Sequence, residues 1–312
     1  MKIAILGASS FLGKTLLRDL KAAAHAVDCF SRTNRFEATQ SWTCYNFPSH
    51  PLSYPDLVNY DVIYYCAGAG IQPKHQDSNQ QIYELNAFEP IRLFTALKER
   101  NYQGKLITFG SYFEIGNHPE ERCYTEQELA THNNPLPNAY CTAKNLLTRF
   151  INTEQLQAEN VSFSFQHFIL TNIYGAEENS NRLIPYIVQS SLKRETLTFT
   201  SGVQQRQYTH ISDVSNFLCQ NLDKNSTGIF NLTDPTVLSV RTMIEKVLAI
   251  VQEELNIEPQ ATFGTLNKRD ISMKYLGLNT SHLQNCFNFA PSISLEKGIR
   301  EYIVRYNQVT HS

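Results

Sequence analysis

Short apolar runs alternate with amphipathic stretches through the first half of the chain. Between the runs, "LGKTLLRDLKAA" and "IYELNAFEPIRLFTALKER" place apolar residues three to four positions apart, as helices do, and another helix begins near Ala139. Five runs have the character of buried strands: residues 2–6, 26–30, 61–66, 105–109 and 161–170. Strands that alternate with helices in this way predict an α/β fold with a doubly wound parallel sheet.

The pattern loosens after residue 171, where short helical and strand-like segments mix without a clean linker. Turn sequences such as "SGVQQ" and "TDPT" separate these segments rather than domains. This half predicts a smaller mixed α/β lobe that closes one side of a cleft. The cleft would lie over the carboxyl ends of the strands, where open parallel sheets bind ligands.

The composition, with 42% hydrophobic and 18% charged residues, is typical of an ordered globular protein. A net charge of −2 gives no general attraction to nucleic acid or to an anionic membrane. The longest apolar stretches are too short to span a membrane, and the N-terminal run is too short for a secretory signal. We therefore expect a cytoplasmic protein without nucleic-acid or membrane partners.

Cysteine and histidine give no sign of a metal site or of sulfur redox chemistry. The seven cysteines are odd in number, widely spaced and without a C-x-x-C pair, so we expect ordinary reduced thiols. His167 and His210 lie in apolar or strand-like surroundings, and we interpret both as structural residues.

The stretch "GASSFLGKT" follows the first predicted strand directly and resembles a phosphate-binding loop. It lacks one glycine of the nucleoside-triphosphate loop, where Ala8 stands, and one glycine of the dinucleotide loop, where Ser10 stands. The dinucleotide loop fits better, because Phe11 and Leu12 then belong to the helix and Gly13 lets helix and strand pack closely. The hydroxyl of Ser10 could still donate to a phosphate oxygen.

The end of the second predicted strand, "CFSRTNR", bears on the form of the dinucleotide. An acidic side chain usually meets a free ribose 2′-hydroxyl at this place, whereas a 2′-phosphate needs arginine. Here Ser31, Arg32 and Arg35 follow without a carboxylate. We therefore expect NADP(H) to be preferred, and NAD(H) stays possible.

Three residues in the middle of the chain suggest proton-transfer chemistry. In "NAYCTAKNLL", Tyr140 and Lys144 are four residues apart on one face of a predicted helix. An ammonium near a phenol favours the phenolate and lowers a pKa that is ordinarily about 10. The strand "KLITF" leads into "GSYFEIG", which places Ser111 at the carboxyl edge of the sheet, where a hydroxyl can meet a substrate oxygen.

Together these features resemble the short-chain dehydrogenase/reductase superfamily, and their spacing is similar to its extended branch, the NAD-dependent epimerase/dehydratase family. The resemblance continues in "DVIYYCAGA", "YELNAFEP", "TNIYGAEENSNRLIPYIV", "SGVQQRQYTHISDVSNFL" and "NKRDISMKYLGLNTSHL". It implies a Rossmann-type NADP-binding domain over residues 1–171 plus about 204–233. It also implies a sugar-nucleotide lobe over about 172–203 and 234–312.

The resemblance assigns roles to single residues. It implies that Tyr140 is the general acid or base, that Lys144 binds the nicotinamide ribose, and that Ser111 hydrogen-bonds the reacting oxygen. Asp213 would begin a helix. The implied cofactor-binding residues are Gly7, Ser9, Ser10, Phe11, Leu12, Gly13, Ser31, Arg32, Arg35, Asn46, Phe47, Cys66, Ala67, Gly68, Asn86, Tyr140 and Lys144. The implied residues for a nucleotide-sugar substrate are Ser111, Tyr112, Asn172, Arg182, Leu183, Arg206 and Arg269.

Departures from the family pattern narrow the expected reaction. The 4,6-dehydratases carry an Asp-Glu pair directly after the catalytic hydroxyl residue, where this chain has Tyr112 and Phe113. The enzymes that make GDP-fucose use a cysteine at the second of these positions and a histidine where this chain has Glu177. Dehydration and double epimerisation are therefore disfavoured, which leaves carbonyl reduction or 4-epimerisation.

Arg32 favours reduction, since net reductases commonly use NADPH. We expect an NADPH-dependent reductase of a nucleotide-linked 4-keto-6-deoxyhexose (a dTDP-, CDP- or GDP-sugar) in deoxysugar and surface polysaccharide synthesis. A nucleotide-sugar 4-epimerase with tightly bound NAD is the first alternative, and a non-catalytic NADP-binding regulatory protein is the second. Residues 80–99 and 140–156 correspond to the helices through which this family often forms a homodimer.

Overall fold

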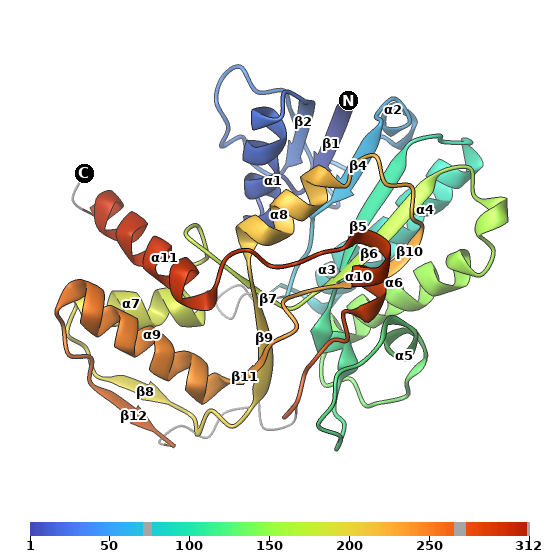
Figure 1. The fold of residues 1–312 in the computed structure, drawn as a ribbon. Helices are drawn as coiled ribbons and strands as arrows, with labels where there is room; N and C mark the ends of the chain where they lie inside the picture. The colour runs from blue at the N-terminus through green and yellow to red at the C-terminus, as the bar shows by residue number, and fades with distance from the viewer. Residues whose placement is uncertain (71–76, 265–272, 311–312) are drawn as a thin grey trace.

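The computed structural model describes residues 1–70, 77–264 and 273–310, and its largest element is a seven-stranded parallel sheet (Figure 1). The strands lie in the order β10-β6-β5-β4-β1-β2-β3. Their bounds are β1 Lys2–Leu6, β2 Ala26–Ser31, β3 Trp42–Cys44, β4 Val62–Tyr65, β5 Lys105–Ser111, β6 Ser164–Leu170 and β10 Gly228–Leu232. Every pairing in this sheet is parallel, so the predicted α/β fold is confirmed.

Strand order creates a crevice at the carboxyl edge of the sheet. The chain passes from β1 outward through β2 and β3, and then returns to β4 on the other side of β1. Open α/β sheets bind ligands at such a reversal, because the loops diverge there. Leu6 is in register with both Phe30 and Tyr65, so the loops that follow β1, β2 and β4 begin at the same edge.

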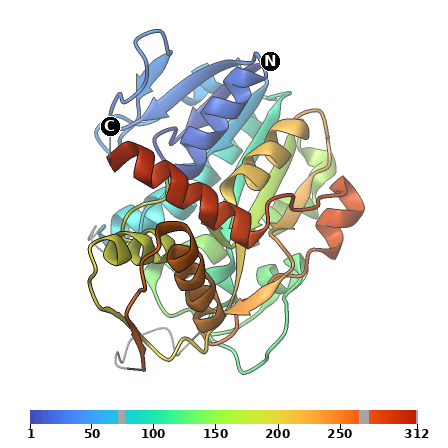
Figure 2. The same ribbon diagram turned by 60° about the vertical axis from the view of Figure 1, so that its left-hand side comes forward.

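Helices cover both faces of the sheet (Figures 1 and 2). Because side chains alternate along a strand, Ile3 and Ile5 pack on one face with α1 (Phe11–Ala22) and α8 (Ile211–Gln220). Leu6 packs on the other face with α4 (Glu89–Glu99) and α6 (Ala139–Gln155). These side chains are fully buried, and each such burial contributes about 1.5–3 kcal/mol.

Short elements connect the main layers. They are α2 Tyr54–Leu57, α3 Asn79–Tyr83, the π-helical turn η1 Glu84–Phe88, the 3₁₀ turns η2 Tyr112–Ile115 and η3 Ala158–Asn160, α5 Glu126–Thr131 and α10 Ser281–Phe287. The turn η1 joins α3 to α4, and η2 follows β5 directly. Both turns carry residues that the sequence assigns to the site, so they fix its local geometry.

The second half of the chain adds a separate hydrophobic core built on two small sheets. One sheet has the order β11-β9-β7, with β7 Asn172–Tyr174, β9 Gln205–His210 and β11 Val237–Ser239. The other pairs β8 Leu197–Phe199 with β12 Ala261–Phe263. Three helices, α7 Leu183–Leu192, α9 Val240–Leu255 and α11 Leu295–Thr310, bury Ile187, Val247 and Ile303 in this core. Figure 2 shows α11 between α1 and the α7–α9 pair.

Asp213 fixes the loop that leads to α11 to helix α8, which covers the large sheet. Its carboxylate accepts hydrogen bonds from the backbone N–H and hydroxyl of Ser292 and from the backbone N–H of Ile293. The expectation that Asp213 begins a helix needs a correction. The N-cap of α8 is His210, whose ring accepts from the N–H of Ser212, and Asp213 lies in the first turn.

All seven cysteines are free thiols. In the part of the chain that the structure describes, no helix combines the length and the apolar character that a membrane span requires.

Candidate active site

The loop between β1 and α1 brings backbone segments into unusually close contact. Gly7 has a φ of +89°, and a Cβ there would lie 2.4 Å from the backbone nitrogen of Ala67. A Cβ on Gly13 would lie 2.6 Å from the carbonyl oxygen of Gly7. Neither position accepts a side chain, which is the property that a dinucleotide loop requires.

Ser10 caps α1, with its hydroxyl oxygen accepting a hydrogen bond of 3.0 Å from the N–H of Gly13. The hydroxyl proton stays free to donate, as expected for a phosphate contact. Leu12 is buried against the sheet and Phe11 packs at its margin, so both belong to the helix as predicted. Ser9 is half-buried within the loop. The remaining backbone N–H groups at this helix N-terminus suit an anion.

The end of β2 presents two arginines to solvent. Arg32 and Arg35 are exposed, and among the described residues neither pairs with a carboxylate. The buried hydroxyl of Ser31 donates to the carbonyl of Thr33 and accepts from the indole N–H of Trp42, and its contact with a cofactor stays a prediction. The exposed arginines can reach an anionic group.

The neighbouring strand ends supply further predicted cofactor residues. Beyond β3, Asn46 donates from its side-chain amide to the hydroxyl of Ser49, and Phe47 is half-buried. Cys66 follows β4, and its N–H donates to the carbonyl of Leu6 at 2.7 Å, which aligns this turn with the β1 loop. Burial raises the pKa of the Cys66 thiol well above its usual range, so this thiol is neutral.

Asn86 lies in the π-helical turn η1 and is 1% exposed. Its amide nitrogen donates to the carbonyls of Ala69 and Ile82, both at 2.9 Å. Its side-chain oxygen has no hydrogen-bond partner among the described residues, and it would lie 2.9 Å from a Cβ on Gly68. A buried acceptor without a partner is costly, so this oxygen is a candidate for a ligand contact.

Ser111, Tyr140 and Lys144 come together at the carboxyl edge of β5. Ser111 is the last residue of β5, whereas Tyr140 and Lys144 lie one turn apart near the start of α6, which Asn138 caps. A side-chain hydrogen bond joins Tyr140 to Ser111. Lys144 donates from Nζ to the carbonyl of Phe109 at 2.7 Å. The structure thus assembles three residues that are well separated in sequence.

Burial dominates the electrostatics of this cluster. Burial raises the pKa of Tyr140 well above its usual value, while the hydrogen bond with Ser111 and the charge of Arg182 act in the opposite direction. Burial lowers the pKa of Lys144, and the nearby carboxylate of Glu114 opposes that change. At neutral pH Tyr140 therefore holds its proton, which suits a general acid.

The remaining residues predicted to contact a substrate either follow β5 or belong to lobe elements. Tyr112 is fully buried, and Asn172 begins β7 and is half-buried. Arg182 caps α7 and donates from Nε to Glu178 at 3.1 Å, and Leu183, the first residue of α7, packs partly against the lobe core. Because the charge of Arg182 acts on Tyr140, this arginine lies beside the cluster.

Arg206 on β9 is a buried cation, only 4% exposed. Its guanidinium donates to the backbone carbonyls of Gln205 and Lys274, and among the described residues it has no carboxylate partner. A buried charge without a counter-ion is costly, so this site favours an anionic ligand. Arg269, the other predicted pyrophosphate arginine, lies outside the described residues.

The sequence matches the NAD dependent epimerase/dehydratase family over residues 3–233. The match runs from β1 to the end of β10 and includes Ser111, Tyr140 and Lys144. The chain belongs to this family.

Individual relatives are distant but span the whole chain. CDP-abequose synthase of Salmonella muenchen is 22% identical over 314 residues, which cover 97% of this chain and 97% of the relative. UDP-glucuronic acid decarboxylase 1 of Danio rerio is 22% identical, with 98% of this chain and 73% of the relative covered. The structure of MoeE5 in complex with UDP-glucuronic acid and NAD covers 99% of this chain and 100% of its own at 18% identity, with a TM-score of 0.80, and shows the same fold.

The family name implies a nicotinamide dinucleotide, and the residues present fit one. Gly7 and Gly13 leave a cradle that side chains would fill, and the N-terminus of α1 opens into it. The side-chain oxygen of Asn86 is buried at the same edge of the sheet, without a partner in the part of the chain that the structure describes.

Sequence reasoning missed two buried carboxylates next to the predicted residues. Glu114 is fully buried three residues after Ser111, in an S-x-x-E capping-box pattern that could have pointed to it. The Glu178 side chain is 6% exposed and bonded to Arg182, and burial raises its pKa to about 7. Only its spacing of four residues from Arg182 hinted at this pair.

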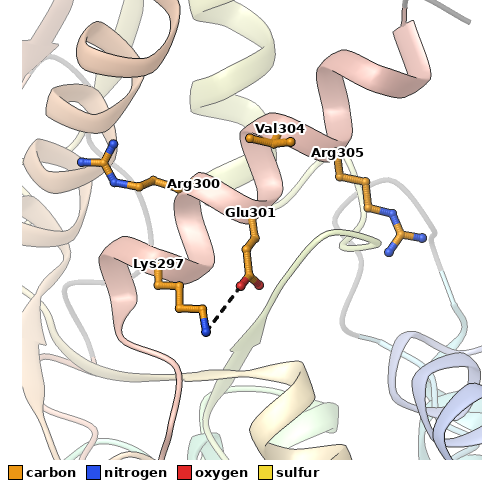
Figure 3. A pocket seen from close by; sticks show the side chains of 5 residues that line it. All are labelled: Lys297, Arg300, Glu301, Val304 and Arg305. Atoms are coloured by element: carbon orange, nitrogen blue, oxygen red, sulfur yellow. Dashed lines mark ion pairs between the residues drawn. The ribbon is translucent and has the colours of Figure 1, made fainter.

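A hollow beside α11 contains none of the predicted site residues. Arg300 pairs with Glu253 and Glu254, and Arg305 pairs with Glu177, so the charge of both arginines is compensated. We therefore assign this hollow no part in the candidate site. It is lined by Lys297, Arg300, Glu301, Val304 and Arg305 (Figure 3).

Proposed function

We propose that this protein is an NADPH-dependent reductase of the 4-keto group of a nucleotide-linked 4-keto-6-deoxyhexose, acting in deoxysugar synthesis. The observation that carries the proposal is the cluster of Ser111, Tyr140 and Lys144 at the carboxyl edge of the sheet. This cluster lies on the same edge as the β1 loop and the exposed Arg32. One acid, one hydroxyl and one cation suffice for carbonyl reduction.

In the proposed mechanism, NADPH supplies a hydride to the carbonyl carbon when bound. Tyr140 donates its phenolic proton to the oxygen of that carbonyl, and the hydroxyl of Ser111 donates a hydrogen bond to the same oxygen. The ammonium of Lys144 then stabilises the phenolate that Tyr140 becomes. Proton transfer from solvent restores the tyrosine. The raised pKa of Tyr140 in the unliganded protein supports a role as acid in the direction of reduction.

The surroundings of Tyr140 argue against elimination of water. Phe113, at a position where dehydratases carry a carboxylate, packs beside Tyr140 with ring centroids 6.4 Å apart. Glu114 is fully buried and binds Thr148 and the backbone of Ser111, so it faces the protein rather than a substrate. No acid-base pair among the described residues therefore accompanies Ser111 toward the cleft.

Glu177 argues against epimerisation of ring carbons. It stands at the position where the GDP-fucose enzymes carry a histidine, and it forms an ion pair of 2.7 Å with Arg305 of α11. Because its carboxylate is engaged by Arg305, Glu177 does not take the place of that histidine.

The proposed substrate contacts are electrostatic. Arg206 is buried and has no carboxylate partner among the described residues, so it suits the pyrophosphate of the substrate. Arg182, whose charge acts on Tyr140, suits the sugar of the substrate. The names of the relatives CDP-abequose synthase and UDP-glucuronic acid decarboxylase 1 support a nucleotide-linked sugar as the substrate class.

We propose further that the protein is a homodimer formed through α6 and the η1–α4 segment. Phe88 of η1 and Leu146 of α6 are exposed apolar side chains, 43% and 38% exposed. Both lie on the pair of segments through which the family often dimerises, and a second copy of the chain would cover them.

The deciding experiment is an assay of the purified protein with NADPH or NADH and a panel of nucleotide-linked 4-keto-6-deoxyhexoses. We expect NADPH to be oxidised with at least one ketosugar. In Tyr140→Phe, turnover should fall by roughly a thousandfold, because the proton donor is lost, while NADPH affinity stays near normal. Undiminished turnover in that variant would refute the assignment.

The same panel separates the alternatives. Bound NAD together with interconversion of nucleotide sugars, without net oxidation of cofactor, would favour a 4-epimerase. Tight NADPH binding without turnover of any sugar would favour a regulatory protein.

A further inference from the structure

Beneath the catalytic cluster, Glu114 forms the centre of a fully buried polar network. One carboxylate oxygen accepts the backbone N–H of Ser111 at 2.6 Å, and the other accepts the hydroxyl of Thr148. The first bond closes a capping box on the 3₁₀ turn that follows β5. Glu114 thus holds the backbone from which the Ser111 side chain projects.

The network continues through His167 to Thr108. Thr148 Oγ1 lies 3.0 Å from Nε2 of His167, and Nδ1 of His167 lies 2.7 Å from Thr108 Oγ1. Thr108 and His167 are directly paired residues of β5 and β6, and Thr148 lies one turn after Lys144 on α6. Three elements that build the active site therefore meet at Glu114.

The direction of these hydrogen bonds can reverse as a unit. If Thr148 donates to Glu114, then His167 donates from Nε2 to Thr148 and accepts from Thr108 at Nδ1. If the group at position 114 donates instead, Thr148 donates to Nε2, and Nδ1 donates to Thr108. Burial lowers the pKa of His167 to about 3, so the ring is neutral and both tautomers are open to it.

Charge links Glu114 to Lys144. Lys144 is 8% exposed and donates a hydrogen bond to the neutral carbonyl of Phe109, so its ammonium needs a compensating negative charge. Burial raises the pKa of Glu114, and the lysine opposes that rise, just as the glutamate opposes the fall in the pKa of Lys144. The thiol of Cys66 also faces Lys144, but it is neutral.

The other titratable groups around Glu114 do not supply this charge. Tyr140 and Cys141 approach from α6, and burial raises the pKa of both, so each is neutral. His167 approaches from β6 and is neutral as well. His132, at the end of α5, contacts the backbone carbonyl of Glu114 rather than its carboxylate, and burial lowers the pKa of that ring.

We infer that Glu114 is a positioning residue of the active site, which fixes Ser111 through its backbone N–H. Its buried carboxylate lies against Gly110, next to the Phe109 carbonyl that binds Lys144, and so supplies negative charge near that ammonium. The catalytic consequence of this inference rests on the proposed function, whereas the electrostatic link between Glu114 and Lys144 does not. Without this charge, Lys144 would lose its proton at lower pH and would no longer support the phenolate of Tyr140.

The test is Glu114→Gln, which keeps the shape and the capping bond, while the reversible network accommodates its amide donor. We expect the Lys144 titration, followed by NMR of ¹³C-labelled lysine and assigned with Lys144→Arg, to move down by roughly one pH unit. The alkaline limb of the kcat/KM profile should move in the same direction, with a loss of about tenfold near that limb.

The matched control is Glu126→Gln. Glu126 is also a buried carboxylate that accepts a backbone N–H, that of Asn231 at 2.8 Å, but it has no role in the cluster. It should leave the Lys144 titration and the pH profile unchanged. A folded Glu114→Gln protein whose Lys144 titrates as in the wild type would overturn the inference.

Two further results keep the conclusions separate. If Glu114→Gln does not fold, Thr148→Val offers a second test, because it removes the hydrogen bond that lowers the pKa of Glu114. This variant should lower the pKa of Lys144 as well, but by less. An unchanged Lys144 titration would again overturn the inference. A shift of Lys144 in a protein that reduces no ketosugar would support the Glu114–Lys144 pair and refute the proposed reductase.

Discussion

At the scale of single residues, the chemistry depends on which polar groups already have partners. Ser31 and Arg32 are adjacent, yet the hydroxyl of Ser31 is used twice within the protein, while Arg32 has no carboxylate partner among the described residues. Sequence alone lists both as cofactor candidates, because it cannot show that Trp42 and Thr33 engage the serine. The proposed preference for a 2′-phosphate therefore rests on the exposed arginine.

Arg32→Ala tests this preference directly. Since a guanidinium–phosphate contact is charge-assisted, we expect the Kd for NADPH to rise by roughly ten- to a hundredfold, corresponding to about 1.5–3 kcal/mol. The Kd for NADH should change much less, because NADH lacks the 2′-phosphate. Isothermal titration calorimetry measures both Kd values in the same variant, so the Kd for NADH serves as the control for the Kd for NADPH. Equal losses for NADPH and NADH would remove the reason to prefer the phosphate form.

At the scale of elements, the sequence predicted long patterns well and short ones poorly. The five predicted strands all occur. Central strands such as β4 and β5 are apolar runs buried on both faces of the sheet, whereas β2, nearer the sheet edge, alternates buried and half-buried residues. The three-residue strand β3 and the small lobe sheets were not predicted, since their pairing depends on distant segments. The division into two domains at the stated boundaries stays a prediction.

In the candidate site, too, residues placed by local patterns were predicted, whereas contacts between distant segments were not. Ser111, Tyr140 and Lys144 were found because strand end and helix spacing place them, and the structure brings them together. Glu114 was missed, although its spacing from Ser111 matches a capping box. Its hydrogen bond with Thr148 depends on the packing of α6 against β5, which no local pattern reveals.

The β1–α1 loop gives a prediction about stability at this scale. Gly7→Ala should destabilise the protein by about 3 kcal/mol or more, because the new Cβ meets the strained φ and also the backbone of Ala67. Gly264→Ala is the matched control, with a φ of +81° and no atom of the described residues within 4 Å of its Cβ, and it should cost about 1–2 kcal/mol. Urea unfolding of both variants measures the difference. Equal costs would mean that the loop relaxes away from Ala67.

At the scale of the whole molecule, three hydrophobic cores are connected, one on each face of the large sheet and one in the lobe. Asp213 of α8 holds the loop before α11, and α11 packs in the lobe core. This connection ties the lobe elements that carry Arg206 and Arg182 to the large sheet. A substrate that is held by both the lobe and the large sheet needs these two parts in fixed positions, because small displacements of the reacting groups reduce rates strongly.

The proposed homodimer makes the last prediction. Phe88 stacks with Tyr83 at 6.2 Å between ring centroids, and with Leu146 it supplies exposed apolar surface on η1 and α6. The double variant Phe88→Asp with Leu146→Asp should convert a dimer into a monomer. Its two carboxylates would be buried in the interface without partners, and the free-energy cost of burying them exceeds the binding free energy that a contact at the rim provides. Sedimentation velocity measures the change in mass.

Val304→Asp, which alters an equally exposed apolar residue on α11, should leave the dimer intact. A wild-type protein that sediments as a monomer at micromolar concentration would refute the proposed interface, and dissociation by Val304→Asp alone would move it to α11.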